Sequence, residues 1–253
     1  MAQIIAIANQ KGGVGKTTST INLAAALGRL GKSVLIVDLD PQGNASSGLG
    51  IDIHKTERTI YEILLEEYSV AECIVESAEK GVQIVPSNVN LSGIEVDLLE
   101  SENRNHRLKG YLDPVRNRFD VILIDCPPNL GILTLNALCA GDGVIIPLQT
   151  EYYALEGITQ LVKVIQMVQK SLNPALALTG VLLTMYDQRT NLSRMVVDDV
   201  RGHFQDAVFQ TIVPRNVKLS EAPSFGQSIL TYAPDSPGAA AYQGVAEELV
   251  KRI

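Results

Sequence analysis

The sequence predicts an α/β fold, doubly wound, with a mostly parallel sheet and helices on both of its faces. Short runs rich in Ile and Val recur along the 253 residues, and each is followed by a turn and then by a helical pattern. The runs do not alternate with polar residues, which is typical of strands buried on both faces of a parallel sheet. Strand and helix patterns that alternate in this way favour the doubly wound arrangement.

The expected elements can be placed by residue number. Strands are expected at Ile4–Ala8, Val34–Val37, Gln83–Val85, Val121–Ile124, Val144–Pro147, Gly180–Thr184 and Phe209–Val213. Helices are expected at Thr17–Leu30, which Gly31 closes as a C-cap, and at Leu130–Ala140, Leu155–Leu172, Ser193–Phe204 and Gly238–Arg252. No linker, repeat or charge block divides the chain, so a single domain over residues 1–253 is expected.

The composition is typical of a globular cytoplasmic protein. Hydrophobic residues make up 46% and charged residues 19% of the chain, which excludes a disordered polymer. The net charge of −7 means that any binding to DNA would need a local basic patch. Three irregularly spaced cysteines and isolated histidines disfavour a disulfide framework or a zinc site. No run approaches the roughly 18 apolar residues of a membrane span, and no signal peptide is apparent.

A phosphate-binding loop is predicted between the first strand and the first helix. The segment reads Gln10-Lys-Gly-Gly-Val-Gly-Lys-Thr-Thr18. Its glycines let backbone N–H groups approach phosphate, and the helix N-terminus adds the positive end of its dipole. We expect ATP to be bound by residues Lys11, Gly12, Gly13, Val14, Gly15, Lys16, Thr17 and Thr18.

Three of these residues have expected roles toward the phosphates. Lys16 should contact the β- and γ-phosphates, the Thr17 hydroxyl should ligate Mg²⁺, and Thr18 should reach the α-phosphate. The alternative is a glycine-rich turn without a ligand. A Gly-Lys-Thr-Thr sequence at a strand-to-helix junction argues against it.

The loop departs from the usual G-x-x-x-x-G-K-[ST] pattern, because Gln10 replaces the first glycine and a second lysine, Lys11, follows it. In this respect the sequence resembles the deviant Walker A family, which includes ParA/Soj, MinD, the nitrogenase iron protein and the arsenite pump ATPase. The resemblance implies an ATP-dependent homodimer in which Lys11 reaches the partner's phosphates and is catalytic together with Lys16. A charge supplied in this way is worth about 10³–10⁵ in rate in other NTPases. The alternative is a solvated loop lysine.

Two aspartates follow the second expected strand. Asp38 and Asp40 stand at alternate positions of Val34-Leu-Ile-Val-Asp-Leu-Asp-Pro-Gln-Gly-Asn44, so their side chains should point the same way, toward the crevice at the strand ends. The family resemblance implies that Asp40 orients or activates the attacking water and that Asp38 supports the metal. Alternatively, both carboxylates cap the Asp-Pro turn.

A third aspartate, Asp125, ends the apolar run Val121-Ile-Leu-Ile and precedes Cys-Pro-Pro128. An apolar strand that ends in aspartate has the Walker B form, so Asp125 should hold Mg²⁺ directly or through a coordinated water. ATP and Mg²⁺ are therefore the expected cofactors.

Segments outside the nucleotide motifs resemble the ParA/Soj branch of the family. These segments are Tyr152–Gly157, Gly180–Met185, Val213–Val217 and Leu219–Pro223. The resemblance implies that Pro214 and Asn216 contact the adenine; the alternative is an ordinary loop after the last strand. It also implies non-specific binding to double-stranded DNA through Arg189 and Lys218, with Arg215 nearby. Each of these could also be an ordinary solvated charge.

The function favoured by the sequence is a Mg²⁺-dependent ATPase for DNA segregation. ATP would drive dimerisation and DNA binding, and a ParB/Spo0J-type partner would stimulate hydrolysis. The protein would be cytoplasmic, with nucleoid association in the ATP state. A MinD-like spatial regulator is the alternative, disfavoured because no amphipathic helix follows Lys251-Arg-Ile253. An iron–sulfur reductase is disfavoured by the cysteines, and a small-molecule ligase has no recognisable substrate motif.

Overall fold

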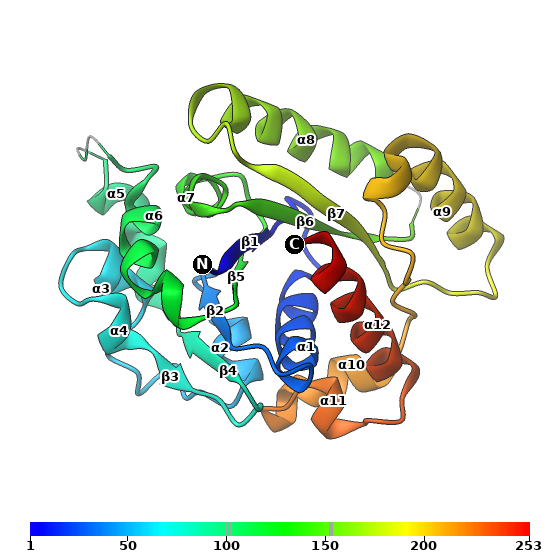
Figure 1. Ribbon diagram of the computed structural model, residues 1–253, viewed down its shortest axis with the longest axis horizontal. Coiled ribbons are helices and arrows are strands. Elements are labelled where there is room, and N and C mark those ends of the chain that lie inside the picture. The colour runs from blue at the N-terminus through cyan, green and yellow to red at the C-terminus, as the bar shows by residue number, and fades with distance from the viewer. Residues whose placement is uncertain (100, 102, 152–153) are drawn as a thin grey trace.

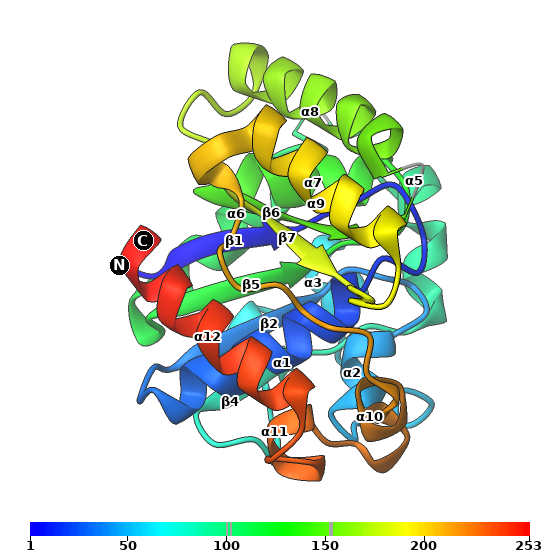
Figure 2. The same cartoon turned by 90° about the vertical axis from the view of Figure 1, so that its right-hand side faces the viewer.

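The computed structural model describes residues 1–99, 101, 103–151 and 154–253, without the side chains of residues 154–157. Tyr152 and Tyr153, the start of the Tyr152–Gly157 segment quoted above, lie outside the described residues. Within the described ranges, seven strands form one sheet in the order β3-β4-β2-β5-β1-β6-β7. Figures 1 and 2 show this sheet between two layers of helices. The predicted doubly wound α/β class is confirmed.

The strands are β1 (Gln3–Ile7), β2 (Val34–Asp38), β3 (Val75–Glu76), β4 (Val82–Val85), β5 (Val121–Asp125), β6 (Gly143–Gln149) and β7 (Ala177–Thr184). All neighbouring pairs are parallel except β3 and β4. Every residue of β2 and β5 is buried, as the continuous apolar runs predicted. The antiparallel edge strand β3 has only two residues, and no sequence pattern indicated it.

Two hydrophobic clusters cover the opposite faces of the sheet. Along β1, Ile4 and Ala6 belong to one cluster, and Ile5 and Ile7 belong to the other. The first cluster packs against α3 (Ile60–Leu64), α4 (Val70–Cys73), α5 (Ile94–Asp97), α6 (Arg107–Leu112), α7 (Ile132–Ala140), α8 (Ala154–Ser171) and α9 (Asn191–Phe204). The second packs against α1 (Lys16–Arg29), α2 (Asn44–Gly48), α10 (Val217–Glu221), α11 (Ile229–Tyr232) and α12 (Pro237–Arg252).

The five long helices expected from the sequence are confirmed, with no end shifted by more than two residues. Gly31 follows the first of them in the left-handed conformation, at φ 81°, and the Lys32 N–H donates to the Leu27 carbonyl. This is the C-terminal arrangement that favours glycine. The short helices between Asn44 and Leu112 were not expected, because each is too short to show a helical repeat.

The expected strand at Phe209–Val213 is wrong. The segment runs beside β7 and bonds to it near its ends, where the Phe209 N–H donates to Val181 O and the Val213 N–H donates to Leu183 O. Between them, the N–H groups of Gln210 and Thr211 donate to the Glu248 carboxylate on α12 instead. The ladder is therefore interrupted, and the segment is flanked only by isolated bridges, from Val208 to Val181 of β7 and from Pro214 to Tyr186 just after that strand.

The parallel strands end at one common edge of the sheet, where the loops after β1, β2, β5, β6 and β7 converge (Figure 2). In doubly wound folds, ligands bind in the crevice at this edge. Among the described residues, no helix combines the length and the apolar character that crossing a membrane requires.

Candidate active site

A cavity of about 510 Å³ opens at the carboxyl edge of the sheet, above the β1–α1 loop. Six of the predicted phosphate-binding residues line it, namely Gly12, Gly13, Gly15, Lys16, Thr17 and Thr18. Gly13 and Gly15 have φ angles of 73° and 91°, a conformation that side chains other than glycine rarely adopt. The loop therefore has the backbone form that a phosphate-binding loop needs at the start of α1.

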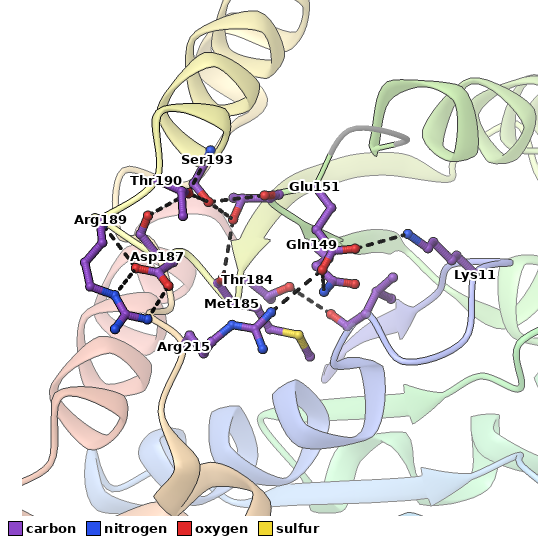
Figure 3. Close-up of polar contacts among 12 residues, drawn as sticks. Lys11, Gln149, Glu151, Thr184, Met185, Asp187, Arg189, Thr190, Ser193 and Arg215 are labelled. Carbon is purple, nitrogen blue, oxygen red and sulfur yellow. Dashed lines mark hydrogen bonds and ion pairs between the residues drawn. The ribbon is translucent and has the colours of Figure 1, made fainter.

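The other two predicted loop residues lie outside this cavity lining. Val14 is buried, and its carbonyl accepts a hydrogen bond of 2.8 Å from the Thr184 hydroxyl at the end of β7. This bond fastens the phosphate loop to the sheet. Lys11 directs its ammonium toward Glu151, at 3.9 Å from the carboxylate (Figure 3).

Lys16 is the cation of the cavity. Its side chain is almost wholly buried, and its ammonium donates to the Lys11 carbonyl at 3.2 Å. Burial lowers the pKa of Lys16, while the negative charge of Asp125 acts in the opposite direction. A largely desolvated ammonium beside glycine N–H groups suits an anionic ligand such as a phosphate.

Asp125 and Asp38 end two adjacent strands, β5 and β2, and lie directly opposite each other in the parallel register. Both are fully buried. Asp125 accepts hydrogen bonds from Thr17 Oγ1 at 2.7 Å and from Thr20 Oγ1 at 2.9 Å. Burial, followed by the charge of Asp38, raises the pKa of Asp125 to about 7. This carboxylate and the Thr17 hydroxyl are hard oxygen donors of the kind that Mg²⁺ prefers, so the donor set fits that ion.

Asp38 has a different set of partners. One of its oxygens accepts from both the N–H and the hydroxyl of Ser46, and the other accepts from the Asp40 N–H. Burial raises the pKa of Asp38 to about 6 against these hydrogen bonds. The side chain thus fastens the β2–α2 loop and the start of α2 to the strand edge, while Asp125 faces the phosphate loop.

Asp40 both caps a turn and lines the cavity. The sequence offered these as alternatives, a turn cap or a carboxylate near the phosphates, and the structure is compatible with both. Its Oδ1 accepts from the Gln42 N–H at 3.0 Å, and its carbonyl accepts from the Gly43 N–H at 2.9 Å. The residue also lines the same cavity as Lys16 and is only 8% exposed. A carboxylate in this position is close to any phosphate bound by the loop.

Pro214 and Asn216 are not among the residues lining this cavity. The Asn216 side chain caps α10 by accepting from the Lys218 N–H, and Pro214 lines a separate cavity of about 520 Å³ with Tyr186 and Arg189. The nucleotide cavity is instead bordered on this side by Met185, Pro223 and Gln227. Met185 and Pro223 stand in segments that carry the ParA/Soj resemblance, and Met185 also directly follows an expected strand, whereas nothing in the sequence indicated Gln227.

The three expected DNA contacts are exposed, and each is paired with a carboxylate. Arg189 makes two hydrogen bonds of 2.9 and 2.7 Å to Asp187, and Lys218 lies 2.8 Å from Glu221. Arg215 lies 3.7 Å from Glu151. Arg189 and Arg215 border the same cavities beside the β7–α9 loop, whereas Lys218 lies on α10. The structure therefore brings two of the three cations together.

Comparison with known proteins places this site in a family. The family described as an AAA domain matches residues 2–178, more than half of the chain. The sporulation initiation inhibitor protein Soj of Bacillus subtilis is 50% identical over 249 residues, covering 98% of each chain. The chromosome partitioning protein ParA of Myxococcus xanthus is 51% identical over 252 residues, covering 100% of this chain and 89% of the relative. The chain belongs to the ParA/Soj family.

A solved structure of similar fold shows the kind of ligand that such a ParA/Soj-like architecture can hold. Cobyrinic acid a,c-diamide synthase from Mycobacterium smegmatis, with bound ADP and magnesium, has a TM-score of 0.89 and 40% identity. The match covers 99% of this chain and 95% of that one. As a member of the ParA/Soj family, the chain is a P-loop ATPase, and the predicted resemblance is confirmed.

Proposed function

We propose that the chain is a Mg²⁺-dependent ATPase that acts as a DNA-segregation switch. ATP binds in the cavity at the phosphate loop, two copies associate around their nucleotides, and the dimer binds DNA without sequence preference. A ParB-type partner then stimulates hydrolysis and releases the DNA. The proposal takes its biological setting from a relative that is named a chromosome partitioning protein.

One observation carries the enzymatic part of this proposal. Lys16, Thr17 and Asp40 line a single cavity, and the Thr17 hydroxyl donates to the buried Asp125 behind it, so a cation for phosphate, a carboxylate for water and oxygen donors for Mg²⁺ are close together. Mg²⁺ would neutralise charge on the bound phosphates, and Thr17 with Asp125 would hold it. Asp38 would act indirectly, by holding the loop that carries Asp40.

The proposed dimer can be tested at Gly12, which is exposed in the single subunit. A Cβ added there would meet only the Pro128 Cβ, at 4.0 Å, so the free subunit would accept a side chain. We expect Gly12→Val to bind ATP and to remain a monomer, because the added side chain would meet the second subunit. Light scattering with ATP checks this, and an ATP-dependent dimer of Gly12→Val would contradict the close approach.

The proposal as a whole is tested by measuring ATP hydrolysis with and without double-stranded DNA, and then with an N-terminal peptide of a ParB-type protein. Joint stimulation by DNA and the peptide supports partitioning. Stimulation by lipid vesicles, with no response to DNA, would favour a MinD-like regulator instead. ATP consumption that depends on a carboxylic acid substrate and an amide donor would favour a small-molecule reaction, in line with the name of the M. smegmatis neighbour.

A further inference from the structure

Glu151 lies two residues after the end of β6, between two basic side chains (Figure 3). Its Oε2 is 3.9 Å from the Lys11 Nζ, and its Oε1 is 3.7 Å from a guanidinium nitrogen of Arg215. The side-chain amide of Gln149 also donates to Oε1. One carboxylate therefore serves as the counter-ion of the proposed intersubunit lysine and of a second cation.

The backbone of Lys11 is held in place while its side chain points to Glu151. The Lys11 N–H donates to Asn9 Oδ1 at 3.0 Å, and the buried Asn9 amide donates in turn to the Pro147 carbonyl of β6. The Lys11 carbonyl accepts from the Lys16 ammonium. In this arrangement the Lys11 side chain does not line the nucleotide cavity.

Lys11 is held by two contacts, from the Lys16 ammonium to its carbonyl and from its own ammonium to Glu151, and bound phosphate would weaken both. Bound phosphate would attract the Lys16 ammonium and release the Lys11 carbonyl. The phosphates of a second subunit would compete with Glu151 for the Lys11 ammonium. Glu151 would keep Arg215 and Gln149 after Lys11 departs, so its carboxylate is not left without partners, which lowers the cost of the exchange.

We propose that Glu151 is a positioning residue for Lys11, holding its ammonium away from the subunit's own cavity until the nucleotide of a second copy of this chain takes it. This inference rests on the proposed ATP-dependent dimer. The side chains of Lys11 and Glu151 are 40% and 47% exposed, so solvent screens their attraction and the effect of Glu151 is modest. We expect about a two- to fivefold effect on dimer dissociation.

The first experiment compares Glu151→Gln with the unaltered chain in the absence of nucleotide. Acylation of Lys11 by an amine-reactive ester, measured by mass spectrometry against the exposed Lys170, should rise about twofold, because the ammonium loses its counter-ion. Glu247→Gln on α12 removes the same charge from an exposed position and should leave the Lys11 labelling unchanged. Unchanged labelling in Glu151→Gln overturns the proposal, whether or not the protein dimerises.

The second experiment measures the ATP-dependent dimer by analytical ultracentrifugation. Glu151→Gln should lower the dimer dissociation constant about two- to fivefold without altering ATP affinity, and Glu151→Asp should restore much of the difference. In a Lys11→Gln background the Glu151→Gln substitution should have no effect, since its target is absent. An effect of equal size in that background shows a role independent of Lys11 and overturns the proposal. An unaltered chain that stays monomeric with ATP refutes the proposed dimer, while the labelling still decides the role of Glu151.

Discussion

The nucleotide cavity and the loop after β7 lie at the same edge of the sheet, but charged side chains are buried at the first and exposed at the second. Lys16 lines the cavity, and Asp38 and Asp125 are bonded to residues that line it. All three are buried, and burial shifts their pKa values in the direction that favours the neutral forms. Beside the β7–α9 loop, Arg189 is 81% exposed and Asp187 is its close partner, which lowers the pKa of Asp187.

The difference indicates which charges are committed to a ligand. Burying charged groups costs free energy, so their retention at the cavity points to a ligand of complementary charge. Exposed ion pairs cost little and contribute little, so they can exchange a carboxylate for a DNA phosphate without disturbing the fold. We therefore expect substitutions at the cavity to have large effects and substitutions near Arg189 to have small ones.

The largest effect is expected for Lys16→Ala. Loss of two charge-assisted hydrogen bonds to phosphate should weaken ATP binding about 10²–10⁴-fold. Isothermal titration calorimetry checks this, with Lys170→Ala on the exposed side of α8 as the matched control. ATP affinity equal to that of the unaltered chain would refute the assignment of the loop.

Asp40→Ala should separate binding from turnover. The carboxylate lies in the cavity but is expected to act on water rather than on the nucleotide, so turnover should fall about 10²–10³-fold while ATP affinity changes little. Single-turnover hydrolysis measures the loss. Asp52→Asn, in an exposed turn, is the control for removal of one negative charge. Normal turnover in Asp40→Ala would remove this residue from the catalytic set.

The stability of the nucleotide-free protein should depend on pH through Asp38. Its pKa is raised from 3.8 to about 6 by burial, so the folded state binds more protons than the unfolded state in between. Stability should therefore fall as pH rises from about 4 to about 6, because the buried carboxyl must then lose its proton. Urea unfolding at several pH values gives the free energy of unfolding as a function of pH, and this pH dependence should be weaker for Asp38→Asn. The readout is the change of the unfolding free energy with pH rather than its absolute value. An unchanged pH dependence in Asp38→Asn would contradict the raised pKa.

Thr184→Val tests the attachment of the phosphate loop to β7. The substitution keeps the shape but leaves the Val14 carbonyl without its 2.8 Å hydrogen bond. Loosening of the loop should weaken ATP binding by about tenfold, which corresponds to the cost of about 1.4 kcal/mol for one unsatisfied carbonyl. Thr184→Ser keeps the hydroxyl and should restore the affinity. If both variants bind ATP equally well, the bond does not hold the loop.

The smallest effect is expected for Arg189→Ala. Removal of one phosphate contact should weaken binding to double-stranded DNA a few-fold and lower the salt dependence by about one unit of slope. Basal ATP hydrolysis should not change. Asp187→Asn should act oppositely, because Arg189 loses its competing carboxylate. A filter-binding titration over several salt concentrations measures both variants, and an unaltered slope for Arg189→Ala would remove it from the DNA patch.

Much of this protein was predictable because its central strands and its phosphate loop are specified locally. The apolar runs that form β2 and β5 and the glycines at Gly13 and Gly15 carry their conformations in the sequence itself. The boundaries of α1 and the position of Gly31 followed from the same local rules. The single domain over residues 1–253 and the roles of Pro214 and Asn216 in binding adenine stay predictions.

Long-range contacts decided what the sequence alone could not. The Glu248 carboxylate takes the amides that would have made Phe209–Val213 a strand, and it comes from a helix almost 40 residues further along the chain. Thr184 reaches Val14, and Glu151 reaches both Lys11 and Arg215, across distances in sequence that no periodicity reports. The sequence by itself therefore determined the sheet, the phosphate loop and the aspartates, because buried strands and glycine turns depend on neighbouring residues. Only the tertiary structure decided which side chains bond to the phosphate loop and to the aspartates, because hydrogen bonds and ion pairs depend on proximity in space.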